Sequence, residues 1–119
     1  MKYKLSDPEV NQLISVDLNK LLSKLKSDCP EFFISPETKN AASLSRIQNC
    51  ISFLKTSDSV EPPLLSTENS LMGVIDGRHR IAAAKKMGYT HLYIEVPRDQ
   101  KELFNCLVYY LVCILKQID

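Results

Sequence analysis

The sequence predicts an α/β (α+β) fold in which a small mixed sheet is flanked by helices. Apolar segments of strand length alternate along the chain with longer segments whose apolar residues recur at helical spacing. Residues 91–96 alternate as a strand does, and residues 71–88 combine an apolar run, a glycine turn and a run of good helix formers. With 119 residues and no internal repeat, the chain is expected to form one domain over 1–119.

The N-terminal half is predicted to contain one strand and two helices. Leu13–Val16 fits a short strand, and Asp17 can cap a helix that continues through residue 26. Residues 27–36 include two prolines and are expected to form a loop that is partly pinned into the core. A second helix is expected over residues 38–54. Its predicted inward-facing residues are Ile47, Ile51 and Leu54.

The middle of the chain is predicted to form a hairpin followed by a helix. Residues 56–60 are polar and are expected to be a linker. A hairpin-like turn at residues 66–70 is expected to join Leu64 and Leu65 to a buried strand at Leu71–Ile75. A helix is then predicted from Arg78 to Met87.

The C-terminal part is predicted to contain a strand and a helix with an unusually apolar surface. The strand covers residues 91–96, where Leu92, Ile94 and Val96 alternate with Tyr93 and Glu95. Asp99 can cap a helix over residues 99–117, and apolar side chains cover nearly the whole circumference of that helix. We therefore expect it to pack across the sheet or to form a homodimer interface, because large exposed apolar patches are rare on monomers.

Composition and charge exclude several classes of protein. Fifteen Lys and Arg residues against fourteen Asp and Glu residues give a formal net charge of +1, so any preference for anions must be local. No secretory signal is expected at the N-terminus, and the apolar run at residues 106–115 is too short to span a bilayer. We therefore expect no membrane association and a cytoplasmic location, in the protein's own cell or in a host cell to which it is delivered.

The four cysteines do not form a metal-binding pattern. No Cys-x-x-Cys pair is present, and neither of the two histidines has ligand spacing to a cysteine. Cys106 and Cys113 lie seven residues apart among apolar neighbours on the predicted C-terminal helix, so they are expected to be small core residues.

The strongest functional signal is the segment that joins the strand at 71–75 to the following helix. Gly77 allows a sharp turn, and Gly88 is the expected stop signal of the helix. The first turn of this helix consists of Arg78, His79 and Arg80, where the helix dipole disfavours positive charge. Free backbone N–H groups at the same place favour an anion. Both an anion-binding site and ordinary scaffold with solvated arginines fit this pattern.

Residues 76–80, followed by a run of alanines and Gly88, resemble the signature of the ParB/sulfiredoxin superfamily. Members of that superfamily carry a Gly-x-[His/Arg]-Arg element at this strand–helix junction. The similarity extends over a motif core at about 44–97, which includes a proline and short strand near residues 61–65 and a strand at residues 93–97. The resemblance implies a ParB/sulfiredoxin-like fold and binding of nucleotide phosphates, with CTP in chromosome-partition proteins and ATP in sulfiredoxins and free-serine kinases.

Nucleotide-binding residues follow from this motif. Gly77 admits the close approach of a phosphate, and Arg80 can grip two phosphate oxygens at once. Arg78 occupies the position of the reactive cysteine of sulfiredoxins, so repair of sulfinic acid is not expected. His79 can donate to a phosphate, orient a nucleophile or simply cap the backbone. The resemblance also implies that Arg46 is a second phosphate clamp.

Two carboxylates are candidates for the chemistry. Asp76 can be a helix cap or turn residue, or it can hold Mg²⁺ or accept a proton from an attacking hydroxyl. Glu61 is a possible base at the mouth of the site, or a solvated loop residue. The catalytic candidates are therefore Asp76 and His79, and the expected cofactors are an NTP (ATP or CTP) and Mg²⁺.

The leading hypothesis is a nucleotide-dependent enzyme that hydrolyses an NTP or transfers its phosphoryl group to an acceptor, as an NTPase or phosphotransferase does. The alternative is a non-catalytic ParB-like module that binds DNA or a partner protein. DNA is possible but not favoured, because chromosome-partition proteins need further domains beyond the nucleotide domain, and we do not expect these here.

Overall fold

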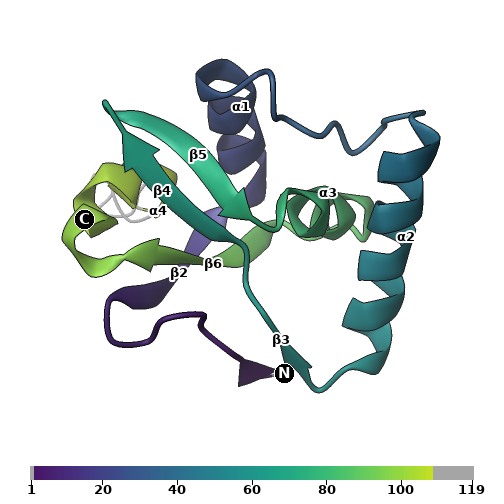
Figure 1. Cartoon of the computed structure of the whole chain (residues 1–119), viewed down its shortest axis with the longest axis horizontal. Helices are drawn as coiled ribbons and strands as arrows, with labels where there is room; N and C mark the ends of the chain where they lie inside the picture. Colours follow the sequence, from purple (N-terminus) through teal and green to yellow (C-terminus); the bar gives the residue numbers. More distant parts are fainter. Residues whose placement is uncertain (1, 109–119) are drawn as a thin grey trace, which may run out of the picture.

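A four-stranded mixed sheet forms the centre of the computed structural model, which describes residues 2–108 (Figure 1). Its order is β2-β6-β4-β5, where β2 is Asn11–Asp17, β6 is His91–Pro97, β4 is Leu64–Glu68 and β5 is Leu71–Asp76. The pairs β2·β6 and β4·β5 are antiparallel, whereas β4 and β6 are parallel. The predicted α/β class with a mixed sheet is therefore confirmed.

Two helices begin at polar caps that fix their first turns. Helix α1 (Leu18–Asp28) starts at the predicted cap, because the Asp17 carboxylate accepts a hydrogen bond from the backbone N–H of Lys20 at 2.9 Å. Helix α2 (Ala41–Thr56) starts later than predicted, after the N-cap Asn40, whose side-chain oxygen accepts from the Ser43 backbone N–H at 3.0 Å. The helix after the glycine turn, α3, covers Arg78–Lys86 and is confirmed.

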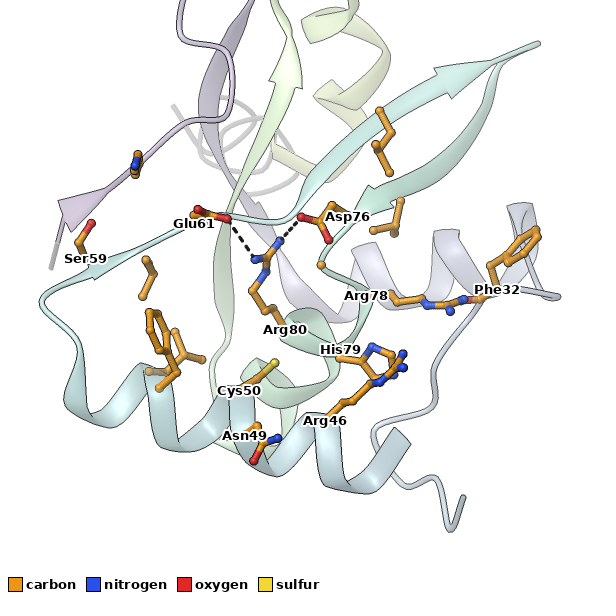
Figure 2. A pocket seen from close by; sticks show the side chains of 17 residues that line it. Phe32, Arg46, Asn49, Cys50, Ser59, Glu61, Asp76, Arg78, His79 and Arg80 are labelled. Carbon is orange, nitrogen blue, oxygen red and sulfur yellow. Dashed lines mark hydrogen bonds and ion pairs between the residues drawn. The ribbon is translucent and has the colours of Figure 1, made fainter. Parts of the chain in front are cut away.

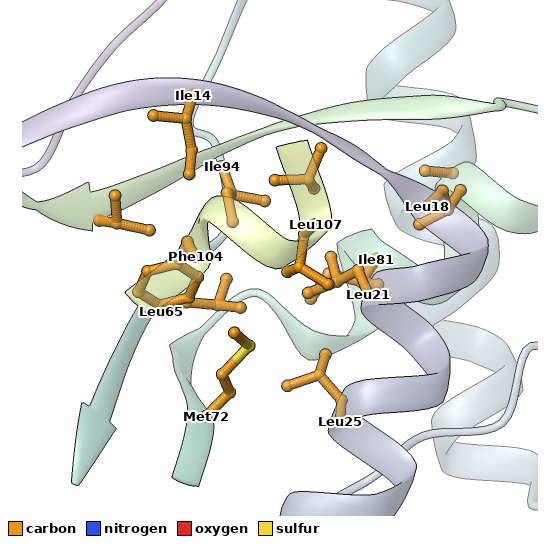
Figure 3. Packing of buried hydrophobic residues seen from close by; sticks show 13 residues of the cluster. Ile14, Leu18, Leu21, Leu25, Leu65, Met72, Ile81, Ile94, Phe104 and Leu107 are labelled. Carbon is orange, nitrogen blue, oxygen red and sulfur yellow. The ribbon is translucent and has the colours of Figure 1, made fainter. Parts of the chain in front are cut away.

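One hydrophobic core joins α1, α3 and one face of the sheet (Figure 3). Leu18, Leu21 and Leu25 of α1 point into it, as the helical spacing predicts. Ile81 of α3 closes the core on the side of the helix that faces α1 and the sheet. The other members of the core come mainly from the strands and the segment after β6, and they are Ile14, Val16, Leu65, Met72, Ala84, Ile94, Val96, Phe104 and Leu107.

Helix α3 lies between this core and α2 (Figure 1). Its residues Ala82–Ala84 are fully buried, and their small side chains allow both neighbours to approach closely. Ile47 of α2 is fully buried against this surface, as predicted, and Ile51 is partly buried there. Leu54 was also predicted to face inward, but it is only partly buried and lines a cleft described below. The buried face of α2 therefore ends before Leu54.

A second, two-stranded parallel sheet corrects the predicted linker at residues 56–60. Strand β1 (Lys2–Tyr3) pairs with β3 (Ser59–Val60), and Val60 is buried. The ring centroids of Tyr3 and Tyr93 lie 4.9 Å apart, which connects this small sheet to β6. Two-residue strands have no detectable alternation, so their pairing depends on contacts that are distant in sequence.

The β4–β5 hairpin has a shorter turn than predicted. Residues 66–68 belong to β4, and only Asn69 and Ser70 form the turn. Both have positive φ, 54° and 65°, as a two-residue type I′ turn requires. The tight turn matches the twist of the two strands and sets their register.

The segment after β6 differs most from its prediction. A 3-10 helix, η1 (Arg98–Phe104), and a short α4 (Asn105–Val108) replace the first part of the continuous helix expected from Asp99. Phe104 and Leu107 fill the core, whereas Cys106 is exposed and is not the core residue that was predicted. The 3-10 segment has a different rotation per residue from an α-helix, so side chains after it point in other directions than a continuous helix from Asp99 would give them.

Residues 109–117 of the predicted helix, with Cys113 and the proposed dimer interface, lie outside the described residues. Within residues 2–108, no helix combines the length and apolar character that are needed to cross a membrane.

Glu95 is the largest departure from the alternating pattern of β6. Its side chain is 1% exposed, although the pattern placed it with Tyr93 on the face opposite to the core residues. The N-terminal segment covers that face. The Glu95 carboxylate accepts hydrogen bonds from the Ser6 backbone N–H and hydroxyl groups, both at 2.9 Å. It also accepts from the Asp7 backbone N–H at 3.1 Å and from the Asn11 side-chain amide at 2.7 Å. Burial raises the pKa of Glu95, but these hydrogen bonds outweigh burial and hold the pKa below its ordinary value.

We expect Glu95→Gln to lower the free energy of unfolding at neutral pH by about 1–3 kcal/mol, because an amide cannot accept from all four donors. Folding lowers the pKa of Glu95, so its stabilising contribution is fully present above the unfolded pKa of about 4.3 and is lost as the pH falls through the folded pKa. Urea unfolding between pH 3 and 7 measures both effects. The exposed Glu102→Gln is the control, and an equally stable Glu95→Gln variant would contradict the assignment.

Candidate functional site

Gly77 forms the sharp junction between β5 and α3. Its φ is +101°, in the left-handed region that favours glycine. An ideal Cβ at this position would lie 2.9 Å from the Pro63 Cα atom and 2.6 Å from the Arg80 Nη2 atom. Both the left-handed backbone conformation and the lack of space for a side chain therefore favour glycine at position 77. It is also the N-cap of α3, and as a glycine it supplies no side-chain acceptor to the first turn.

A bulge in the hairpin precedes this junction. Leu64 pairs with Asp76 and Leu65 pairs with Val74, so Ile75 is an extra residue on β5. The side chain of Ile75 is 62% exposed and lines the cleft. The bulge thus alters the direction of the strand immediately before the glycine turn.

Arg80 lies between the two candidate carboxylates (Figure 2). Its Nη2 atom donates to Asp76 Oδ2 at 3.2 Å, and its Nη1 atom lies 3.9 Å from Glu61 Oε2. The Arg80 Nε atom is buried and has no hydrogen-bond partner among residues 2–108. Two predicted site residues, Asp76 and Glu61, are therefore brought together by the arginine that was predicted to grip phosphate.

Three further cationic or titratable groups meet at the start of α3. Arg46 reaches His79 from α2, and Arg78 extends past His79 toward Phe32, whose backbone oxygen accepts from Arg78 Nη1 at 3.4 Å (Figure 2). Burial lowers the pKa of His79, and the positive charges of Arg46 and Arg78 lower it further. The Nε2 atom of His79 is buried without a partner in the described part of the chain.

The charge of this second group is not neutralised within residues 2–108. Neither Arg46 nor Arg78 forms an ion pair there, whereas Arg80 contacts two carboxylates. We refer to Arg46, Arg78 and His79 as the cationic cluster. It adds to the partial positive charge at the N-terminus of α3, so the local potential is positive although the net charge of the chain is only +1.

All the predicted site residues border a single cleft of about 970 Å³ between α2, α3, β3 and the end of β5 (Figure 2). This volume is in the range of small-molecule sites. The structure thus places Arg46, Glu61, Asp76 and residues 77–80 around one cavity. The first turn of α3 lines this cavity.

Sequence analysis missed a second set of cleft residues. They come from α2, the loop before it and the N-terminal sheet, and they include Lys4, Phe32, Asn49, Cys50, Phe53 and Ser59. The spacing from Arg46 through Asn49 and Cys50 to Phe53 was a usable signal, because these positions share one face of a helix. Burial raises the pKa of the Cys50 thiol even though Arg80 acts to lower it, so Cys50 has no sign of a reactive thiolate.

Asp76, the predicted Mg²⁺ ligand, is not part of a cluster of metal-binding side chains in the described residues. Among residues 2–108, no group of three or more His, Cys, Asp or Glu side chains gathers where it could hold a metal ion. Glu61 and Asp76 flank the guanidinium of Arg80, which occupies the space between them. These residues do not form a protein-held metal site in this arrangement.

Comparison with protein-family models, curated proteins and solved structures gives no significant match to this chain.

Alanine substitutions at Gly77 and Gly88 distinguish the two requirements for glycine at position 77, the positive φ and the lack of space for a side chain. Gly88 also has positive φ, +83°, but no atom lies within 4 Å of its ideal Cβ position. We expect Gly88→Ala to cost about 1–2 kcal/mol of stability from φ alone. Gly77→Ala should cost clearly more, because the added methyl group meets the Pro63 backbone and Arg80. Equal losses in urea unfolding would show that the approach of Pro63 is not a constraint.

Proposed function

We propose that this protein is a nucleotide-binding domain of ParB/sulfiredoxin type whose cleft takes the phosphates of an NTP. The observation that supports this most strongly is the cationic cluster. The positive charges of Arg46 and Arg78 both act on the partly buried imidazole of His79, and neither arginine has a carboxylate partner in the described residues. Like charges repel each other, and an anion in the cleft relieves that repulsion.

A phosphate group suits the donors that the cleft provides. The two guanidinium groups offer planar pairs of N–H donors that match phosphate oxygens. The first turn of α3 lines the cleft and has no side-chain cap, so it adds free backbone N–H groups, and the unpartnered His79 Nε2 atom adds a donor in its Nε2–H tautomer. The cationic cluster is therefore the primary phosphate contact in this proposal.

Arg80 has a different role from the one that the motif suggested. Its two terminal nitrogens already contact Asp76 and Glu61, so it grips a phosphate with both of them only by leaving at least one of these carboxylates. The contact with Glu61 is the longer one, at 3.9 Å, and the Glu61 side chain is 65% exposed. In this proposal a bound phosphate draws Arg80 away from Glu61, and the released carboxylate then serves as the base.

The proposed reaction is hydrolysis of an NTP or transfer of its phosphoryl group to an acceptor hydroxyl. Arg46, Arg78 and Arg80 stabilise negative charge on the phosphoryl oxygens, and Glu61 accepts the proton of the attacking water or hydroxyl. His79 is held neutral by burial and its arginine neighbours, so it acts as a positioning hydrogen-bond partner. No step is assigned to Mg²⁺, because the described residues do not form a site for it.

Replacement of Arg78 tests the phosphate site directly. We expect Arg78→Ala to weaken binding of tripolyphosphate, ATP or CTP by about tenfold to a hundredfold in calorimetry, because it removes a charged hydrogen bond. Arg98→Ala is the matched control, since Arg98 is an exposed arginine outside the cleft that donates to the Pro8 carbonyl. Both variants lose the same charge, so an equal weakening would mean that only overall charge matters.

Absence of any affinity for polyphosphate or nucleotide in the unmodified protein would refute the proposal. If duplex DNA binds instead, with a steep dependence on salt and no effect of nucleotides, the non-catalytic module is the correct interpretation.

The protonation of His79 gives an independent test. Folding lowers its pKa, so we expect the folded protein to titrate His79 below about 6.5 in NMR spectra. A bound polyphosphate neutralises Arg46 and Arg78 and should raise that pKa again. The stability of the free protein should therefore rise with pH between the folded and unfolded pKa values. The NMR signals of His91, which lies outside the cleft, are the internal control. A His79 pKa that does not change when polyphosphate binds would contradict the assignment.

A further inference from the structure

One face of helix α2 lines the cleft over more than two helical turns. Arg46, Asn49, Cys50, Phe53 and Leu54 all border the cavity, and their spacing of three or four residues places them in one stripe. The adjacent face of α2 packs on α3 through Ile47, and Cys50, at the boundary between the two faces, is partly buried against the same cluster. Arg46, Asn49 and Phe53 are exposed and are available to a ligand in the cleft.

The chemistry of this stripe changes in order from one end to the other. Arg46, near the start of α2, belongs to the cationic cluster. Asn49 is exposed in the middle and has no partner within the described residues, so its amide offers both a donor and an acceptor. Phe53 and Leu54 are apolar and lie one turn further on. The rise from Arg46 to Phe53 is about 10 Å, which is comparable with the span from the phosphates to the base of a nucleotide.

The far end of the cleft is suited to a planar ring. Phe53 is 54% exposed and borders the cleft, so its ring is open to a ligand there. The buried Val60 and the Ser59 hydroxyl group of β3 border the cavity at this end, so an apolar surface has a polar group beside it. Figure 2 shows Ser59 on the side of Arg80 opposite to Arg78, which separates this end from the cationic cluster.

We infer that the cleft binds a nucleoside polyphosphate lengthwise along α2, with its base against Phe53, its sugar beside Asn49 and its phosphates at the cationic cluster. This inference rests on the proposed phosphate site and adds the orientation and the class of ligand. The alternative aromatic residue, Phe32, lies beside Arg78 at the cationic end, so a base there would leave the apolar end empty (Figure 2). A phosphate chain alone does not use the apolar half of the stripe.

Calorimetric titration of ATP, CTP and tripolyphosphate tests this orientation. We expect Phe53→Ala to weaken binding of the nucleotide by about tenfold and to leave tripolyphosphate binding unchanged, because stacking with a base is lost and the phosphate contacts remain. Phe53→Trp should retain nucleotide affinity, since a ring is still present. Leu103→Ala is the control, because Leu103 is another exposed apolar side chain and does not line the cleft.

Several results would overturn the inference while the phosphate site stands. The first is that tripolyphosphate binds as tightly as the nucleotides. The second is that Phe53→Ala weakens the binding of tripolyphosphate and nucleotide equally. The third is that Phe32→Ala, and not Phe53→Ala, weakens nucleotide binding alone. Failure of the unmodified protein to bind tripolyphosphate and nucleotides refutes the phosphate site and the inference with it. The melting temperatures of the variants without ligand verify that each one is folded.

Discussion

The buried carboxylate of Glu95 is the interaction on which the rest of the structure depends. Its oxygens hold Ser6, Asp7 and Asn11, so a single side chain fixes the N-terminal segment against the sheet. The backbone N–H of Glu95 also donates to the Pro63 carbonyl at 2.8 Å, where β6 meets β4 in parallel. Because a buried charge is tolerated only with full hydrogen bonding, this arrangement permits little displacement of the segments around it.

Pro63 connects Glu95 to the candidate site, because it contacts both Glu95 and Gly77. Its Cα atom approaches Gly77 so closely that no side chain fits there, and the left-handed backbone of Gly77 directs the chain into α3. Arg80, one turn later, lies over Gly77 and contacts Asp76 and Glu61 on either side. Backbone packing around Gly77 thus places Arg80 where it contacts both carboxylates.

Local signals in the sequence predicted the elements that depend on local physics. The Asp17 cap, the glycine turn and the strand–helix order needed only neighbouring residues to be recognised. The burial of Glu95 was missed because the alternation of β6 does not reveal that a distant segment covers its second face. Phe53 and Asn49 were missed for a related reason, since the face of α2 that borders the cleft depends on how α2 packs on α3.

The start of α3 combines good packing with unfavourable electrostatics. Ile81 and the buried alanines Ala82–Ala84 are anchored between two helices and the sheet, so they hold the helix in place whatever its first turn contains. Arg78 and His79 lie where the helix dipole and Arg46 both oppose positive charge. A local conflict that the surrounding fold maintains is typical of functional sites. Since the stabilising contacts and the charged groups are on different residues, changes in the cluster should alter ligand binding far more than folding.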